Sequence, residues 1–249
     1  MKLTEKNFRG IKTEVQQGRL TMKGNRLFLL TSLLYSGFIV GFSFYIANES
    51  TVGWDNLSQA WHALYYIEGA LFILQILLFL FCWAPSDFNQ KLLSVSRVLY
   101  TYKMSLDPFL LVLMFSKDDQ TYNDVFPLVL SIITIGIIIH LFMLFKWIRS
   151  LNGEISDKKR KKKDNKNTMI LIILVVVIST MLFTRSSFLG DQELSILIIS
   201  VSVVYIAMLI GVVEFIIASY CVFSFSSFRA NASSKYHLGN KKKRRKKKR

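Results

Sequence analysis

The chain has few cysteines and none of the short motifs that mark known active sites. Only Cys82 and Cys221 occur among 249 residues, and both lie in apolar runs. This argues against a disulfide framework, and we interpret both as packed thiols. No HExxH, GxSxG, Walker loop, CxxC pair or paired-Asp metal motif is present. We therefore expect a non-enzymatic protein with no catalytic residue, no metal ligand and no cofactor.

A cleavable signal peptide is also not evident. The first apolar run begins at Leu27 and has no clear small-x-small cleavage site. It continues for about 21 residues, which is long enough to remain in the membrane. We interpret it as a retained first span.

Long apolar runs dominate what is present. Hydrophobic residues make up 52% of the chain, and the mean hydropathy is +0.37. Runs of about 20 residues match a hydrocarbon core roughly 30 Å thick. The sequence predicts an all-α membrane protein, with a six-helix domain at residues 27–223 and spans at about 27–47, 60–83, 92–115, 125–147, 168–185 and 194–223.

The third predicted span decides the topology, because it contains Arg97, Lys103 and Asp107. If residues 92–115 cross the membrane, every loop rich in Lys and Arg lies on one side. The positive-inside rule then places both termini in the cytoplasm. We therefore interpret the segment as a span, with Arg97 near its inner end and able to extend toward water.

Two short basic runs, at residues 158–163 and 241–249, carry nearly all of the net charge of +16. We expect them to contact the anionic cytoplasmic leaflet of the bilayer, with binding of RNA or ribosomes by the tail as the alternative. The tail, residues 224–249, is predicted to be disordered and polybasic. The lipid-contacting residues are Lys158, Lys159, Arg160, Lys161, Lys162, Lys163, Lys241, Lys242, Lys243, Arg244 and Arg245.

The N-terminal segment, residues 1–26, is polar and basic. Phe8, Ile11 and Val15 recur at helical spacing within it. This pattern favours a short amphipathic helix on the membrane surface, and a disordered basic leader is the other interpretation.

Charged residues inside the predicted spans are the candidate functional residues. Lys103 and Asp107 lie four residues apart on one helix face, and Glu68 of the second span has the same predicted depth as Asp107. The cluster is either a neutralised ion group that fixes helix register or a binding or proton-relay site. A kink at Pro108 would favour the second reading.

A second polar pair is His140 on the fourth span with Glu214 on the sixth, which we predict to be close enough to hydrogen-bond. Small residues predict close helix packing at Gly37 and Gly41 of the first span, with dimerisation as the alternative, and at Ala207 and Gly211 of the sixth.

These features support three functions. The predicted topology resembles that of permease subunits of ABC-type exporters, and this resemblance implies a transport or export component served by a separate ATPase subunit. The alternative is an interaction protein, such as an immunity factor against a membrane-active toxin or an assembly scaffold, bound to another membrane protein or to copies of itself. A lipid-modifying enzyme using His140 and Glu214 is the third. We expect the protein in a bacterial cytoplasmic membrane.

Overall fold

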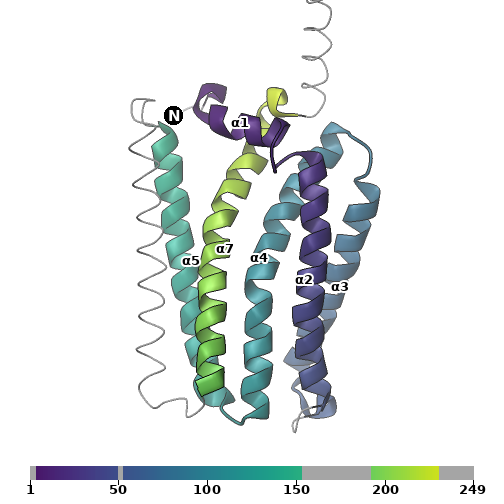
Figure 1. Ribbon diagram of the computed structural model, residues 1–249, viewed down its shortest axis with the longest axis vertical. Helices are drawn as coiled ribbons and strands as arrows, with labels where there is room; N and C mark the ends of the chain where they lie inside the picture. The colour runs from purple at the N-terminus through teal and green to yellow at the C-terminus, as the bar shows by residue number, and fades with distance from the viewer. Residues whose placement is uncertain (1–3, 50–52, 153–191, 230–249) are drawn as a thin grey trace, which may run out of the picture. The chain divides into compact units, whose positions relative to one another are not determined.

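The described part of the chain is helical. The structure is a computed structural model that describes residues 4–49, 53–152 and 192–229, and these residues contain no strand. Figure 1 shows the described helices, coloured by residue number. The α-helices are α1 (Arg9–Gln16), α2 (Met22–Glu49), α3 (Gln59–Phe81), α4 (Asp87–Asp118), α5 (Tyr122–Asn152) and α7 (Gln192–Ser224). Three short 3₁₀ helices are η1 (Glu5–Phe8), η2 (Trp54–Asn56) and η3 (Ser226–Phe228).

Five of these helices are long and apolar enough to cross a membrane: α2, α3, α4, α5 and α7. This indicates an integral membrane protein. Five of the six predicted spans fall on these helices. The other predicted span, residues 168–185, lies outside the described residues, as do both basic runs.

The span that carries three charges is a single helix, α4, which continues through Pro108. It is also the most buried of the five, with 67% of its most apolar stretch inside the protein, against 11% for α3. A segment with this much charge tolerates a membrane because its charges face protein and not lipid.

The chain divides into two compact units. Unit 1 comprises Met1–Leu33, Ile73–Tyr100 and Glu214–Arg249, and unit 2 comprises Leu34–Phe72 and Thr101–Val213. Helices α2, α3, α4 and α7 each run through both units, with one segment in each.

In unit 1 the N-terminal helix α1 packs against the end of the chain that follows α7. Phe8 at the end of η1 is buried, as are Ile11 and Val15 of α1, and the Phe8 ring lies 5.6 Å from that of Phe225. Gln16 Nε2 donates to the backbone oxygen of Ser227 at 2.7 Å. Figure 1 shows α1 and η3 side by side. The predicted amphipathic helix is therefore present, but its apolar face is covered by protein.

The core of unit 2 joins α4, α5 and α7. At its centre, α5 and α7 approach closely at Gly136, where an added Cβ would overlap the Tyr205 ring. Tyr205 is 1% exposed, and its hydroxyl donates to the backbone oxygen of Ile133 at 2.9 Å. The buried core residues are Phe109, Val112, Leu113, Val125, Leu128, Val129, Ile132, Leu194, Ile198, Val201, Tyr205, Ile206 and Leu209.

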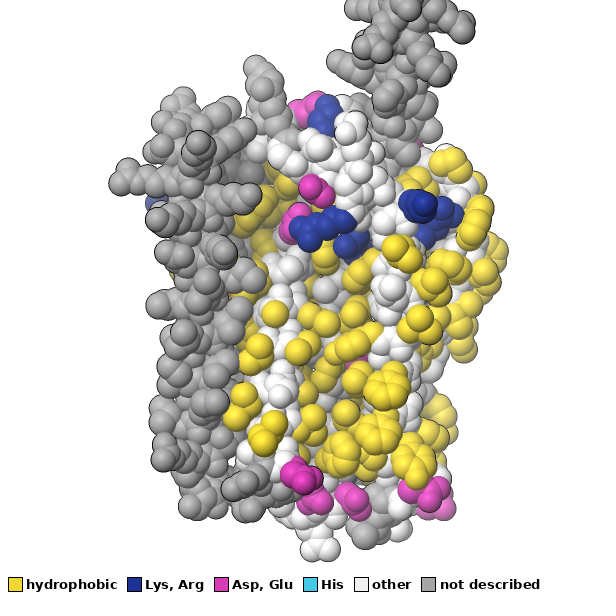
Figure 2. Space-filling view, in the orientation of Figure 1, with side chains coloured by type: hydrophobic (Ala, Val, Ile, Leu, Met, Phe, Trp, Pro, Cys, Tyr) yellow, Lys and Arg dark blue, Asp and Glu magenta, His cyan; other side chains and the backbone are white. Residues whose placement is uncertain are grey.

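The small residues predicted to pack do not do so within the described part of the chain. Gly37, Gly41 and Ala207 are exposed, and a Cβ placed at Gly37, Gly41 or Gly211 meets no described atom within 4 Å. Large apolar neighbours such as Phe38, 73% exposed, lie beside them. Hydrophobic side chains are exposed along the described helices (Figure 2), as expected where lipid replaces water as the solvent.

Candidate functional site

The three charges predicted to meet in the membrane do lie together, all within unit 2. Lys103 of α4 places its Nζ 2.6 Å from Glu68 Oε2 of α3. The same nitrogen lies 2.9 Å and 3.1 Å from the two carboxylate oxygens of Asp107, one turn further along α4. One ammonium thus bridges two carboxylates from two helices.

The cluster is buried. Exposed fractions of the side chains are 4% for Lys103, 1% for Asp107 and 16% for Glu68. The Lys103 ammonium also lies 4.3 Å from the centre of the Phe72 ring, a distance at which the ring face attracts a cation. The lysine is therefore fully engaged, with an ion pair on either side and an aromatic ring beside it.

His140 is held by two hydrogen bonds in unit 2. Its Nδ1 lies 2.9 Å from the backbone oxygen of Leu209, and because a carbonyl oxygen only accepts, Nδ1 carries the proton. Its Nε2 then accepts the hydroxyl proton of Tyr102 at 2.7 Å. Both ring nitrogens are used in joining α4, α5 and α7, which leaves no free nitrogen to act as a base.

Glu214 has a different partner from the one predicted. Its carboxylate pairs with the guanidinium of Arg19, which lies just before α2 in unit 1. The predicted hydrogen bond between His140 and Glu214 is therefore not formed. The sequence offered no signal for Arg19, because it precedes the first apolar run.

The sequence predicts that the Arg97 side chain extends toward water, but the structure buries it. Arg97 is 7% exposed, and its Nη1 donates to Asn25 Oδ1 at 2.9 Å and to the backbone oxygen of Arg19 at 3.0 Å. The Cζ of Arg97 lies over the rings of Phe28 and Phe215, 4.7 Å and 4.1 Å from their centres. Because Phe28 and Asn25 belong to α2 and Phe215 to α7, Arg97 joins three helices of unit 1.

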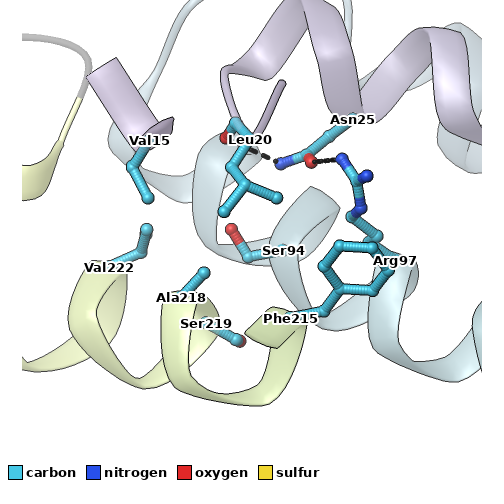
Figure 3. A pocket seen from close by; sticks show the side chains of 9 residues that line it. All are labelled: Val15, Leu20, Asn25, Ser94, Arg97, Phe215, Ala218, Ser219 and Val222. Carbon is cyan, nitrogen blue, oxygen red and sulfur yellow. Dashed lines mark hydrogen bonds between the residues drawn. The ribbon is translucent and has the colours of Figure 1, made fainter. Parts of the chain in front are cut away.

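A small cavity lies beside Arg97 in unit 1 (Figure 3). It has room for about one water molecule. Figure 3 shows Asn25 hydrogen-bonded to Arg97 on one side of it. The cavity is lined by Val15, Leu20, Asn25, Ser94, Arg97, Phe215, Ala218, Ser219 and Val222. Neither Lys103 nor either of its carboxylate partners reaches it.

Two further polar contacts between α2 and α3 could not be predicted as pairs. Gln75 Nε2 donates to Ser32 Oγ at 2.6 Å in unit 1. In unit 2 the hydroxyls of Ser43 and Tyr65 lie 2.7 Å apart. Gln75 and Tyr65 can be recognised in the sequence as polar residues within an apolar run. Their partners cannot be predicted, because the sequence does not determine which residue of a neighbouring helix faces them.

No protein-family model, curated protein or solved structure matches the chain. The described residues also contain no group of three or more His, Cys, Asp or Glu side chains able to hold a metal ion. Function must therefore be inferred from the chemistry of the chain's own buried polar groups.

Proposed function

We propose that the protein is a non-enzymatic interaction component of a bacterial cytoplasmic membrane, such as an immunity factor or an assembly scaffold. Its buried charges hold the helices in register and leave the lipid-facing surface to bind another membrane protein. The observation that carries this proposal is the state of Lys103, which is buried and paired with two carboxylates. The small cavity beside Arg97 in unit 1 is lined by other residues and not by Lys103.

We further propose six spans with both termini in the cytoplasm. Residues on either side of the spans meet in unit 1, because Gln16 precedes α2 and its hydrogen-bond partner Ser227 follows α7. Two segments in contact outside the membrane lie on the same side, which requires an even number of crossings. Five candidate helices are described, so this contact supports one additional crossing within residues 153–191, where the sequence predicts a span.

Labelling of single cysteines tests this topology. In a background with Cys82→Ser and Cys221→Ser, Thr4→Cys and Ala84→Cys are expected to react only after the cells are opened, and Asp119→Cys in intact cells. All three positions are exposed to solvent. Reaction of Ala84→Cys and Asp119→Cys from the same compartment would contradict the proposal, because residues 84 and 119 flank α4.

In this arrangement the basic runs at residues 158–163 and 241–249 lie on the cytoplasmic side, where each Lys or Arg near an anionic surface contributes about 1 kcal/mol of attraction. They would bind anionic lipids and reinforce orientation. RNA binding by the tail and self-association remain secondary proposals.

Transport or export is the second candidate, with Glu68, Lys103 and Asp107 as the polar site and a separate ATPase subunit as the partner. The exposure of Glu68 is the observation in its favour, because this side chain is 16% exposed and is the most accessible of the three. This candidate requires the ion pairs to open so that Lys103 can meet a substrate.

A charge-free variant distinguishes the two functions. The triple variant Glu68→Gln, Lys103→Met, Asp107→Asn removes both ion pairs and leaves no buried charge without a partner. If the cluster only fixes helix register, the variant should restore the wild-type phenotype to a deletion strain and retain the same membrane partners. A variant that folds and reaches the membrane but fails to complement would support the transport function instead.

A further inference from the structure

The charges of the Glu68, Lys103 and Asp107 cluster do not balance when all three groups are ionised. Two carboxylates share one ammonium, and no other cation of the described residues lies within ion-pair distance of either carboxylate. The fully ionised cluster would carry one surplus negative charge. Asp107 is 1% exposed, so solvent screens little of that charge.

An uncompensated charge in such surroundings is strongly unfavourable, and a buried carboxylate in this position takes up a proton instead. The groups around the cluster offer no other compensation. Tyr35 of α2 lies near Asp107 and Tyr65 of α3 lies near Glu68, and both are neutral phenols at physiological pH. Among the described residues, no charged group of α5 or α7 forms an ion pair with Asp107.

Ser36 of α2 also lies beside the cluster. It is 1% exposed, and its hydroxyl has no hydrogen-bond partner that meets geometric criteria among the described residues. The hydroxyl lies close enough to interact with the Asp107 carboxyl group. It can donate to the ionised carboxyl and accept from the protonated one, so it fits both states of Asp107. The surplus charge, and not Ser36, therefore carries the inference below.

We propose that the cluster holds one proton in addition to those of the Lys103 ammonium, shared between the carboxyl groups of Glu68 and Asp107. One carboxyl is then the ion partner of Lys103, the other is a carboxylic acid, and the cluster is neutral. The proton comes from water and returns to water, with no other reactant. This protonation site goes beyond the proposed function, because it holds whether or not the protein transports a substrate.

Infrared difference spectroscopy of the purified full-length protein in lipid at neutral pH tests the proposal. Glu68→Gln and Asp107→Asn are compared separately with wild type. Either change leaves one carboxylate for one ammonium, so each variant is expected to lose the carbonyl stretch of one carboxylic acid. Two difference spectra without such a band would overturn the proposal.

The pH dependence of stability gives a second readout. The folded wild type binds one proton that the unfolded chain has released at neutral pH, so stability falls as the pH rises. For each pH unit, the equilibrium constant for unfolding is expected to rise by a factor that is up to tenfold larger in wild type than in either variant. If one variant does not fold, the other suffices, because each removes the surplus charge. Equal pH slopes in wild type and a folded variant would overturn the proposal.

Discussion

Replacing Lys103 with Met should destabilise the protein by about 3–5 kcal/mol at neutral pH, because removal of the ammonium leaves one buried carboxylate without its counter-charge. Both carboxylates depend on this single ammonium, Glu68 at 2.6 Å and Asp107 at 2.9 Å. Unfolding of the purified variant in mixed micelles of mild and denaturing detergent measures the loss. Acidification should restore part of it, since a second proton then neutralises the remaining carboxylate.

The matched control adds Glu68→Gln and Asp107→Asn to Lys103→Met. This triple variant keeps the shape of the cluster without its charges, and it should recover most of the stability lost in the single variant, since neutral replacement of a buried ion group is often tolerated. A Lys103→Met protein as stable as wild type would show that the ammonium does not hold α3 and α4 together. Equal instability of the single and triple variants would assign the loss to packing and not to charge.

Replacing Gly136 with Ala should destabilise unit 2 by about 1–3 kcal/mol, the usual cost of overfilling a packed core. The new methyl group would lie 2.8 Å from Cζ of Tyr205. The ring cannot move aside easily, because Tyr205 is buried, its hydroxyl bonds Ile133, and its ring packs edge-on against Phe109 at 5.2 Å. Detergent-induced unfolding again provides the measurement.

Gly69→Ala on α3 is the matched control. A Cβ at Gly69 meets no described atom within 4 Å, and alanine favours a helix over glycine by up to about 1 kcal/mol. The two substitutions should therefore change stability in opposite directions. Similar effects at Gly136 and Gly69 would contradict the close approach of α5 and α7 and point to a general response of the helices to alanine.

Hydrophobic run length was sufficient to predict the five long helices of the described residues. Residues 92–115 illustrate why, because a run that contains Arg97, Lys103 and Asp107 still forms one helix, α4. Helix packing was harder to predict. GxxxG spacing drew attention to Gly37 and Gly41, which meet no described atom, whereas the close contact at Gly136 has no such pattern. A spacing rule shows where helices can approach, and only the facing residue decides whether they do.

In the candidate site, too, some contacts could be predicted from the sequence and others depend on helix packing. Lys103 and Asp107 could be paired from sequence because they are one turn apart on one helix. Equal depth then suggested Glu68 as the third member, and the structure places it 2.6 Å from Lys103. Depth alone was not enough for His140, whose partners are Tyr102 and Leu209, because rotation of each helix about its axis is set by side-chain packing. The same limit hid the contact of Glu214 with Arg19.

The contact between Gln16 and Ser227 joins residues 211 positions apart, and this separation governs the order of assembly. A ribosome releases α1 long before α7 exists, so Phe8, Ile11 and Val15 lack the partners that α7 and η3 provide during most of translation. Until the last helix is inserted, an apolar helix face of this kind binds at the lipid headgroup boundary. We therefore expect the N-terminal segment to contact lipid first and to exchange it for protein once α7 has been made.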